Sequence, residues 1–497
     1  MSAEMSFPAR LAQLAAEAPH AVAITFVDAD GQETDVTRRE LHLRAVRFSR
    51  VLAERGVGPG TMVVTGIPNS VEHIVIAIAA WRCGACTVAQ SARAPDREFA
   101  ETLKLLEARF VIADRAGADM GHDDVRAITR DDSRDAEAFP DRIAHPGKAT
   151  ASGGSTGRPK IIVYPHAWVR VPGEIGDISH IGFRSGQIQL VCGPLYHNAP
   201  FTWAHFGLFE GHRLILMERF DAARAVDLIE RHRCSFMFFA PTMMQRIIRL
   251  PDIHARDLSS IRSIFITAAI CPVWLKQAWA DLIGAEKLEE SYGSSEAVGY
   301  AHISGPEWLA HRGSVGRAGD GDLKILDAAF NEVPTGEIGE IFFRPTHYPR
   351  PTYAYIGSPP AKTTPDGYTS VGDMGHVDAE GFLYIADRRT DLIISGGVNV
   401  YPAEVEAVLT EHAAISDAAV VGLPDADWGR RVHAIVEPVD PSGAIPLDEL
   451  YAWMRERLSA PKIPKTIEFT PALPRDQSGK IRRSALIAAR TPEGLSQ

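Results

Sequence analysis

Hydrophobic and polar positions follow two different periods along the first 150 residues of the chain. Apolar residues spaced three or four apart predict an amphipathic helix at residues 7–16, and further helices are predicted at 38–55 and 70–82. Short runs of consecutive apolar residues predict buried strands at residues 21–27, 62–65 and 110–113. Strands that alternate with helices indicate an α/β arrangement with parallel strands. Residues 114–148 are polar, charged and weakly periodic, which predicts surface structure.

The same two patterns continue after residue 160. Buried strands are predicted at residues 187–192, 214–217, 236–239 and 263–266, and helices at 222–232 and 243–250. Short β runs at 323–325 and 338–343, separated by Gly, Asn and Pro, predict a small β-rich part. A smaller unit of helices and strands then follows, with helices at 403–412 and 447–458 and strands at 418–421, 432–436 and 467–469.

A charged segment at residues 387–391 separates these regions, and a glycine-containing segment, 393–402, follows it. We place a domain boundary here, with residues 1–389 as the large N-terminal domain and 390–497 as the C-terminal domain. The fold class is therefore α/β, with layered α/β subdomains and a small β-rich part in the large domain, and a smaller α+β domain at the C-terminus. A surface turn inside one domain is the alternative interpretation of residues 387–391.

Length and composition narrow the possible functions. A chain of 497 residues with 45% hydrophobic and 23% charged residues is typical of a globular protein of more than one domain. Its formal net charge of −11 argues against a nucleic-acid partner, because phosphate neutralisation needs a basic face. The longest apolar run, residues 74–81, is far shorter than a membrane span, so we expect no integral membrane segment.

Five scattered cysteines suggest a reducing compartment, and no N-terminal signal peptide is evident. We therefore expect a cytoplasmic protein. Cys83 and Cys86 have the spacing of a redox or half-zinc site, but the chain contains no second pair of this kind. A structural role for both thiols is the favoured interpretation.

Residues 152–160 (Ser-Gly-Gly-Ser-Thr-Gly-Arg-Pro-Lys) carry the first chemical signal. Glycines let backbone N–H groups approach a ligand, and with hydroxyls and a nearby ammonium they form an anion cradle. A flexible Gly/Ser linker is the alternative. The stretch is not a Walker loop, which needs Gly-Lys followed by Ser or Thr, because Pro159 precedes Lys160 and Ile161 follows it. Nor is it the dinucleotide Gly-x-Gly-x-x-Gly pattern.

The stretch resembles the phosphate loop of the adenylate-forming (ANL) superfamily, which includes acyl-CoA synthetases, peptide-synthetase adenylation modules and luciferases. It departs from the common form by having Ser152 and Gly153 in the first two places. Four further segments resemble motifs of this superfamily in the same order, namely 292–297 (Tyr-Gly-Ser-Ser-Glu-Ala), 370–376, 384–388 and 473–482. The resemblance extends from about residue 7 to about residue 485.

The resemblance implies an ATP site. Its residues would be Ser152, Gly154, Ser155, Thr156, Gly157, Lys160, Ala268, Ala269, Tyr292, Gly293, Ser295, Asp373, Tyr384 and Arg388. Glu296 would bind Mg²⁺, since hard cations prefer carboxylate and phosphate oxygens. Asp373 would accept both ribose hydroxyls. Lys480 would contact the substrate carboxylate and the α-phosphate, where negative charge builds up. The alternative interpretation is that these residues have no part in ligand binding and form polar turns, a surface ion pair and a solvated lysine.

The resemblance also implies a moving C-terminal domain and a second substrate. Thr390 aligns with the residue about which the small domain rotates between two half-reactions, although Asp or Lys is commoner at that place. Gly396 and Gly397 would then let the pantetheine arm of coenzyme A pass close to the backbone.

For the acid substrate, the resemblance points to residues 194–203 and 267–272. The pocket residues would be Tyr196, His197, Phe201, Trp203, Ala204, Thr267, Gly293 and Ala297. His197 would act at the carboxylate end, and a satisfied core histidine is its alternative. Aromatic and small residues at 196–206 favour a bulky apolar acid, such as an aryl-alkanoate, a steroid-like or bile-acid-like acid, or a medium- or long-chain fatty acid.

The function expected from these motifs is an ATP-dependent carboxylic acid–CoA ligase that forms an acyl-adenylate and then a thioester. An amino-acid adenylation enzyme is the nearest alternative, but residues 195–206 contain no Asp or Glu to hold an amino group. A luciferase-like oxygenase and a non-catalytic acyl-ligand sensor also stay open. The sequence does not fix the oligomeric state, and a homodimer is one assembly it allows.

Overall fold

The computed structural model describes residues 3–134, 139–153, 159–174, 178–346, 350–441, 445–476 and 479–491. Contacts within the chain divide it into two compact units. The first unit comprises Met1–Ala268, Leu282–Val298 and His347–Pro360, and the second comprises Ala269–Asp281, Gly299–Thr346 and Ala361–Gln497. The boundary that the sequence predicts near Thr390 stays a prediction.

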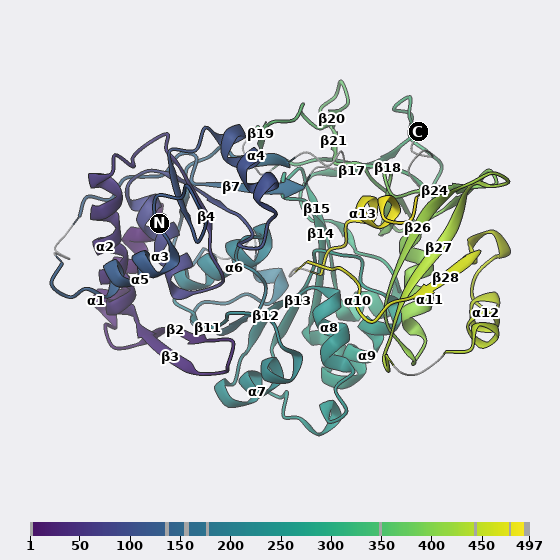
Figure 1. The fold of residues 1–497 in the computed structure, drawn as a ribbon, viewed down its shortest axis with the longest axis horizontal. Helices are drawn as coiled ribbons and strands as arrows, with labels where there is room; N and C mark the ends of the chain where they lie inside the picture. The colour runs from purple at the N-terminus through teal and green to yellow at the C-terminus, as the bar shows by residue number, and fades with distance from the viewer. Residues whose placement is uncertain are drawn as a thin grey trace. The chain divides into compact units, whose positions relative to one another are not determined.

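A mostly parallel sheet forms the centre of the first unit (Figure 1). Its strands in that unit, in spatial order, are β14 (Leu288–Gly293), β13 (Ser263–Ile266), β12 (Phe236–Phe239), β10 (Ile188–Val191), β11 (Arg213–Met217), β2 (Val22–Val27) and β3 (Glu33–Thr37). All neighbours from β14 to β2 are parallel, and β3 is antiparallel to β2. β12 reads Phe-Met-Phe-Phe and is buried throughout, as expected for a parallel strand covered on both faces.

A second sheet of the first unit carries the segments that flank the predicted phosphate loop. Its order is β19 (Ala354–Ile356), β8 (Pro159–Tyr164), β7 (Lys148–Gly153), β5 (Cys86–Ala89), β4 (Met62–Gly66) and β6 (Phe110–Ala113). The strands from β6 to β7 are parallel, while β8 is antiparallel to both of its neighbours, β7 and β19. β1 (Met5–Ser6) pairs separately with β9 (Val169–Arg170).

The helices of the first unit bury apolar faces against these sheets and against each other. They are α1 (Phe7–Glu17), α2 (Arg38–Glu54), α3 (Val71–Arg82), α4 (Asp96–Leu106), α5 (His122–Arg130), α6 (Asn198–Phe209), α7 (Ala222–His232) and α8 (Pro241–Ile248), with short 3₁₀ turns at Ser179–Ile181, Ile253–Ala255 and Ala285–Lys287. α3 is buried on every side, and Trp81 near its end is 1% exposed. The side chain of Ser70 accepts a hydrogen bond from His73 N and so caps α3.

The second unit begins with a β-rich part. Its antiparallel sheet has the order β20 (Lys362–Thr363), β21 (Thr369–Ser370), β18 (Gly339–Arg344), β22 (Asp373–Val377) and β23 (Leu383–Arg388), and β17 (Asp322–Leu326) also pairs with β18. In this unit β15 (Tyr300–Ser304) also pairs antiparallel with β16 (Arg317–Ala318), and the helices are α9 (Val273–Ile283) and α10 (Gly305–Ala310).

The C-terminal part of the second unit is α+β. Its sheet has the order β25 (Val398–Val400), β24 (Ile393–Ser395), β27 (Gly429–Pro438) and β26 (Ile415–Asp425), and β28 (Thr466–Phe469) runs parallel to β27. The long pair β26 and β27 stands out in Figure 1. α11 (Pro402–Glu411) and α12 (Leu447–Arg455) contribute Val405, Leu409, Leu450 and Met454 to its core. A 3₁₀ turn at Ala460–Lys462 and α13 (Arg483–Ala488) complete the chain.

The expected α/β class, the parallel strands of the large domain and the α+β character of the C-terminal part are confirmed. The expectation for residues 114–148 was incomplete. α5 lies in this segment and buries Val125 against the core that α2 and α3 share. Among the described residues, no helix is both long enough and apolar enough to cross a membrane.

Candidate active site

Lys160, Glu296 and Tyr355 meet within the first unit, although they are far apart in sequence. The Lys160 Nζ lies 3.1 Å from Glu296 Oε1, and the same ammonium donates to the Tyr355 hydroxyl at 3.1 Å. The Tyr355 hydroxyl in turn donates to Glu296 Oε1 at 2.6 Å. The structure thereby brings together the lysine of the predicted phosphate loop and the predicted Mg²⁺ ligand.

This contact follows from strand pairing. Lys160 lies on β8, and β19 pairs with β8 so that Tyr355 is opposite Ile162. Side chains two residues apart share a face of a sheet, which puts Tyr355 and Lys160 on the same side. The Lys160 ammonium also lies 4.4 Å from the centre of the Tyr355 ring, within the range of a cation–π contact.

The surroundings of Glu296 favour its ionised form. Its side chain is 5% exposed, and burial alone would raise the carboxyl pKa. The Lys160 charge and the hydrogen bonds from Tyr355 and Lys160 outweigh burial, so the pKa of Glu296 is lowered. Thr352 donates to the backbone oxygen of Glu296 at 2.8 Å and fixes that residue from a second side. The result is a buried carboxylate that carries a negative charge at neutral pH.

The predicted phosphate loop is only partly described. Ser152 lies on β7 and Lys160 on β8. Gly154, Ser155, Thr156 and Gly157 lie outside the described residues.

Several predicted residues follow the carboxyl ends of the parallel strands of the central sheet. Tyr196 and His197 come after β10, Thr267 comes directly after β13, and Gly293 ends β14. Parallel strands end at the same edge of a sheet, where α/β proteins bind their ligands. The other predicted residues of these two loops are Ala268, Ala269, Tyr292, Ser295 and Ala297, of which Ala268, Ala269 and Ser295 are exposed.

Among the described residues of the predicted site, two that carry a Cβ have left-handed backbone conformations. Ala268 has a φ of 80° and Ala297 a φ of 50°. Such angles are uncommon for residues with a Cβ and occur mainly at functional sites or helix ends. Glu107 and Arg233, which have similar angles, are helix C-caps. Ala268 and Ala297 terminate no helix, so the strain belongs to the loops that follow β13 and β14.

The turn that leads to His197 is held by a buried amide. Asn69 donates to the backbone oxygens of Gly193 and Met217 at 2.9 and 3.1 Å and accepts from Leu195 N at 2.7 Å. His197 is the N-cap residue of α6, and its ring lies 4.4 Å from that of Tyr196. The sequence did not single out Asn69, since a lone Asn before a helix reads as an ordinary cap.

The residues predicted to form the wall of the acid pocket lie on different faces of α6. Phe201 and Ala204 are 4% and 0% exposed and lie in the core cluster that contains Trp81. Trp203 points instead toward a second cluster, where its ring is 5.2 Å from Phe265 and 5.7 Å from Phe183. A helix repeats every 3.6 residues, so positions 201 and 203 face different directions. These three residues therefore do not share one surface.

In the second unit, Asp373 and Arg388 are brought together. They are opposite each other on β22 and β23, and Arg388 Nε lies 3.4 Å from Asp373 Oδ1. Tyr384, also on β23, stacks on His376 with ring centres 4.9 Å apart. Its hydroxyl donates to Asp378 at 3.2 Å. The predicted ribose-binding pair thus occupies one end of a two-stranded ladder.

Gly396 and Gly397 form the two-residue turn between β24 and β25. Their φ angles are 57° and 81°, the left-handed pair that a tight hairpin turn requires. A Cβ at Gly396 would lie 2.7 Å from the Trp428 ring, so only glycine fits there. Thr390 is exposed in a turn. Lys480 N donates to Asp476 Oδ1 at 3.0 Å, and Asp476 N donates to Lys480 O at 2.8 Å. These two hydrogen bonds close the loop that carries Lys480, which we call the lysine loop.

Residues 11–348 match the family described as AMP-binding enzyme, and residues 404–480 match the AMP-binding enzyme C-terminal domain. The chain belongs to the AMP-binding enzyme family. Feruloyl-CoA synthase of Amycolatopsis sp is 31% identical over 504 residues, with 96% of each chain covered. The 2-succinylbenzoate–CoA ligase of Geobacillus sp. (strain WCH70) is 30% identical over 495 residues, with 97% of each covered.

Solved structures of the same family have the same fold. The o-succinylbenzoate CoA synthetase of Bacillus subtilis, in complex with the acyl-adenylate intermediate OSB-AMP, superimposes with a TM-score of 0.79 at 25% identity, covering 97% of this chain and 98% of that one. The same enzyme has also been solved with ATP and a magnesium ion (TM-score 0.78, 25% identity, covering 97% of this chain and 100% of that one). The resemblance to acyl-CoA synthetases that the motifs indicated is confirmed.

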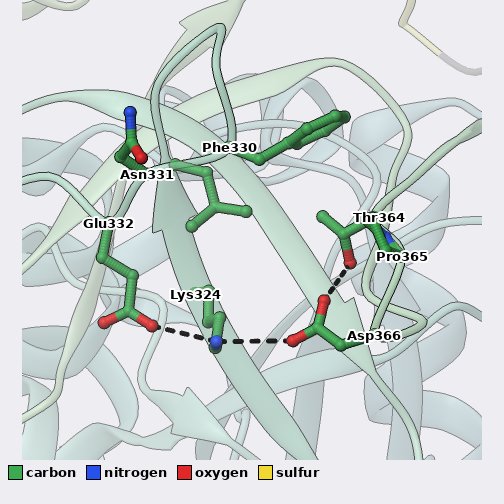
Figure 2. Close-up of a pocket in the computed structure, with 8 residues that line it drawn as sticks. Lys324, Phe330, Asn331, Glu332, Thr364, Pro365 and Asp366 are labelled. Atoms are coloured by element: carbon green, nitrogen blue, oxygen red, sulfur yellow. Dashed lines mark hydrogen bonds and ion pairs between the residues drawn. The ribbon is translucent and has the colours of Figure 1, made fainter.

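This AMP-binding enzyme also has a hollow that none of the motifs predicted (Figure 2). Figure 2 shows Lys324 between two carboxylates, and its Nζ lies 3.0 Å from Glu332 and 3.6 Å from Asp366. Phe330 and Thr364 also line the hollow. Since its cation is already neutralised by two neighbours, we interpret the hollow as a structural feature of the β-rich part.

Lys148 is a buried cation that sequence analysis did not identify. It begins β7 and donates to Asn198 Oδ1 and, at 2.6 Å, to Thr202 Oγ1 in the first turns of α6. Its ammonium lies 5.5 Å from the Trp168 ring and has no carboxylate partner among the described residues. Burial lowers the pKa of Lys148 to about 7.

Proposed function

We propose that this AMP-binding enzyme is an ATP-dependent carboxylic acid–CoA ligase. A carboxylate oxygen of the acid attacks the α-phosphorus of ATP, which forms the acyl-adenylate and releases pyrophosphate. The sulfur of CoA then attacks the acyl carbon, loses its proton and displaces AMP. The observation that carries the proposal is the contact of Lys160 with Glu296 and Tyr355, because it joins two motifs that would serve the same nucleotide.

The charges at this contact suit a magnesium–nucleotide complex. Mg²⁺ in enzymes commonly takes one or two carboxylates together with substrate phosphates, and the ionised Glu296 fits that requirement. A bound Mg²⁺ would neutralise charge on the phosphates. The Lys160 ammonium would bind phosphate oxygens, while Tyr355 and Thr352 keep Glu296 in place.

The remaining predicted residues complete the proposal. The hydroxyls and backbone N–H groups of the phosphate loop and Ser295 would bind the phosphates, Tyr292 would pack on adenine, and Asp373 and Arg388 would hold the ribose. Lys480 would stabilise charge on the α-phosphate in the first step. A rotation of residues 390–497 about Thr390 would then withdraw Lys480 and admit CoA beside Gly396 and Gly397.

The proposed acid is bulky, apolar and ring-bearing. Trp203 and Phe206 on α6 face an aromatic cluster that includes Phe183, Phe238 and Phe265. Aromatic side chains offer large apolar surfaces for an aromatic ligand. The relatives named for feruloyl and 2-succinylbenzoate substrates support the same class of acid.

We further propose a cytoplasmic location, which five buried cysteines without a disulfide support. A homodimer is the proposed assembly. Light scattering on the purified protein measures it directly.

The test is a panel of acids assayed with ATP, Mg²⁺ and CoA for AMP release and for the acyl-CoA product by mass spectrometry. We expect the highest kcat/KM with hydroxycinnamates or arylalkanoates, a lower value with long-chain fatty acids, and little activity with acetate. Glu296→Gln, which keeps the shape of the side chain but removes its charge, should lower the rate of pyrophosphate exchange by about 100-fold or more. The matched control is Glu290→Gln on β14. Highest turnover with acetate would refute the bulky-acid assignment, and AMP release that does not need CoA would refute the ligase.

Lys480→Ala separates the two half-reactions. We expect it to slow formation of the adenylate severely, to a residual rate that can still be measured, and to leave thioester formation from a preformed acyl-adenylate largely intact. An equal loss in both steps would contradict the role assigned to Lys480. Lys465→Ala, an exposed lysine of the same part of the chain, is the control.

A further inference from the structure

The linker around Thr390 is fastened on both sides. On the N-terminal side, Arg389 N donates to Gly372 O at 2.9 Å, and the Arg389 guanidinium donates to Glu340 at 3.2 Å. On the C-terminal side, Asp391 accepts a hydrogen bond from Arg483 at 2.8 Å. Thr390 lies between these two attachments and is exposed. Any rotation of the backbone between these two attachments is therefore limited to the few backbone bonds around Thr390.

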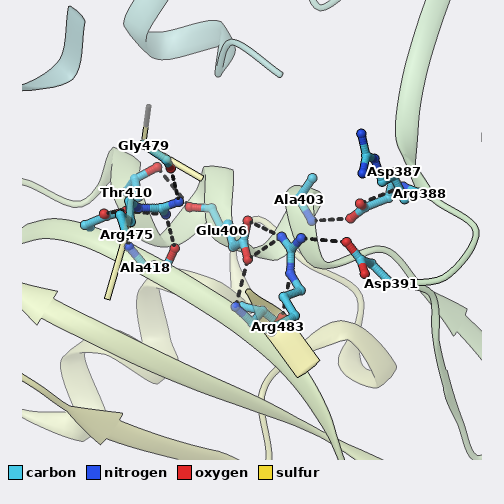
Figure 3. A network of polar contacts seen from close by, with 12 residues as sticks. Asp387, Arg388, Asp391, Ala403, Glu406, Thr410, Ala418, Arg475, Gly479 and Arg483 are labelled. Atoms are coloured by element: carbon cyan, nitrogen blue, oxygen red, sulfur yellow. Dashed lines mark hydrogen bonds and ion pairs between the residues drawn. The ribbon is translucent and has the colours of Figure 1, made fainter. Parts of the chain in front are cut away.

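Arg483 is the centre of the C-terminal attachment (Figure 3). Its Nη2 donates to both carboxylate oxygens of Glu406, at 2.8 and 2.9 Å, and its Nε donates to Val420 O at 3.2 Å. Figure 3 shows the guanidinium between Glu406 and Asp391. The side chains of Arg483 and Glu406 are each 17% exposed, so this is a largely buried ion pair in which one nitrogen donates to both carboxylate oxygens. One guanidinium thus connects the linker, α11 and β26.

The same arginine begins α13 and lies three residues after Lys480. On the other side of the lysine loop, Arg475 is held by both oxygens of Asp417, and its Nη1 donates to Gly479 O at 2.9 Å. Two largely buried arginines therefore bracket Lys480, and both are anchored to acidic residues of the same body. A long lysine side chain can be aimed reproducibly only if its backbone is fixed in this way.

We propose that Arg483 is a positioning residue for Lys480, because it fastens the lysine loop and the linker residue Asp391 to one rigid body. The proposal rests on the proposed ligase function and adds to it. Lys480 and residues from Asp391 onward move as a unit, and Thr390 is the place where that unit turns. Arg483 itself touches neither substrate nor nucleotide in this assignment.

The test is Arg483→Gln, with Arg490→Gln as the matched control. Arg490 makes a bidentate pair with Glu468, at 2.7 Å for both bonds, just after the same helix, but it does not contact the linker. We expect Arg483→Gln to lower pyrophosphate exchange by about 10- to 100-fold, since misplacement of a catalytic group by about 1 Å costs rates of that order. KM for ATP and the rate of thioester formation from a preformed acyl-adenylate should change by less than about threefold. Arg490→Gln should leave both half-reactions unchanged.

A double-mutant cycle distinguishes positioning from a general loss of structure. If Arg483 acts through Lys480, Arg483→Gln combined with Lys480→Ala should be no slower in adenylation than Lys480→Ala alone. A further loss in the double variant, or equal losses in the two half-reactions of a folded Arg483→Gln protein, would overturn the proposal. Unchanged adenylation in Arg483→Gln would overturn it as well. If the wild type shows no pyrophosphate exchange with any acid, the ligase function itself fails, which is a separate result.

Limited trypsin digestion tests the attachment without any substrate. Arg388 and Arg389 are cleavage sites in the linker, and release of Asp391 should raise the rate of cleavage there several-fold in Arg483→Gln but not in Arg490→Gln. Asp391→Asn, which keeps the Arg483–Glu406 pair, provides a milder variant if Arg483→Gln does not fold. It should change digestion and adenylation in the same direction, and equal digestion rates in all these proteins would refute the attachment.

Discussion

Lys148 makes the stability of this enzyme depend on pH in the direction opposite to that of a lysine in an ion pair. Burial lowers the pKa of its ammonium from 10.5 to about 7, while the unfolded chain keeps the ordinary value. Between those two pKa values the unfolded chain binds the proton and the folded enzyme does not. The cost of burying the charge is therefore fully present below pH 7 and disappears as the pH rises toward 10.5.

The size of this effect follows from the difference in pKa. A pKa lowered from 10.5 to about 7 corresponds to about 5 kcal/mol of free energy over the whole titration, and about 3.5 kcal/mol of it falls between pH 7 and pH 10. Two other titratable groups interact with the ammonium, Cys86 on β5 and His205 on α6, and His73 on α3 interacts with His205 in turn. Burial raises the pKa of Cys86 to about 12 and lowers the pKa values of His205 and His73 to about 3 and about 4. These three groups therefore keep their folded-state charges from pH 7 to pH 10.

The perturbation is Lys148→Met, which keeps the length of the side chain and removes its charge. We expect the free energy of unfolding of the wild type, measured by urea denaturation with tryptophan fluorescence, to rise relative to that of Lys148→Met by about 3.5 kcal/mol from pH 7 to pH 10. Comparing the two proteins cancels the titration of all other groups. Lys104→Met, on the exposed side of α4, should show no such difference. Parallel pH profiles for the wild type and Lys148→Met would refute the buried, unpaired charge.

Two further predictions concern the carboxylates at the site and the linker. Tyr355→Phe removes the hydroxyl that donates a hydrogen bond to the charged Glu296, so we expect the rate of pyrophosphate exchange to fall by about three- to tenfold. Tyr353→Phe is the control. An unchanged rate in Tyr355→Phe would contradict the role of Tyr355 in holding Glu296. Burial raises the pKa of Asp387 from 3.8 to about 6, so its negative charge costs stability above pH 6, and this cost is relieved as the pH falls from about 6 to about 4. Asp387→Asn should therefore be more stable than the wild type at pH 8, by at most about 3 kcal/mol, and the gain should vanish at pH 4; a less stable variant at pH 8 would contradict this assignment.

The sequence predicted those parts of the fold that have a strong apolar period. The strands at 110–113, 236–239 and 263–266 and the helix at 222–232 have the predicted bounds, because each is a compact apolar run or a clear amphipathic pattern. α6 was not predicted, because its own residues are apolar on almost every side and leave no polar face from which a helical period could be recognised. Tertiary burial on both sides of α6 also explains why Phe201 and Trp203 face different clusters.

The candidate site was predictable where short motifs carried it and not where distant side chains complete it. Glu296 and Lys160 were proposed as site residues from their motifs, but Tyr355 lies near neither in sequence and reaches them through the pairing of β19 with β8. Strand register of this kind depends on tertiary structure and leaves no local signal. For the same reason the sequence gives no sign that Lys148 is special, because its hydrogen-bond partner Asn198 lies 50 residues further along the chain.

The Gly396–Gly397 turn also sets limits for engineering. A side chain at position 396 would collide with the Trp428 ring, so a variant there has to rebuild the packing between two hairpins. A Cβ at position 397 would lie more than 4 Å from every other described side chain and from the backbone beyond its chain neighbours. The φ angle at this position is one that asparagine tolerates. A mutant library that varies position 397 and leaves position 396 untouched would therefore explore this loop while keeping the hairpin intact.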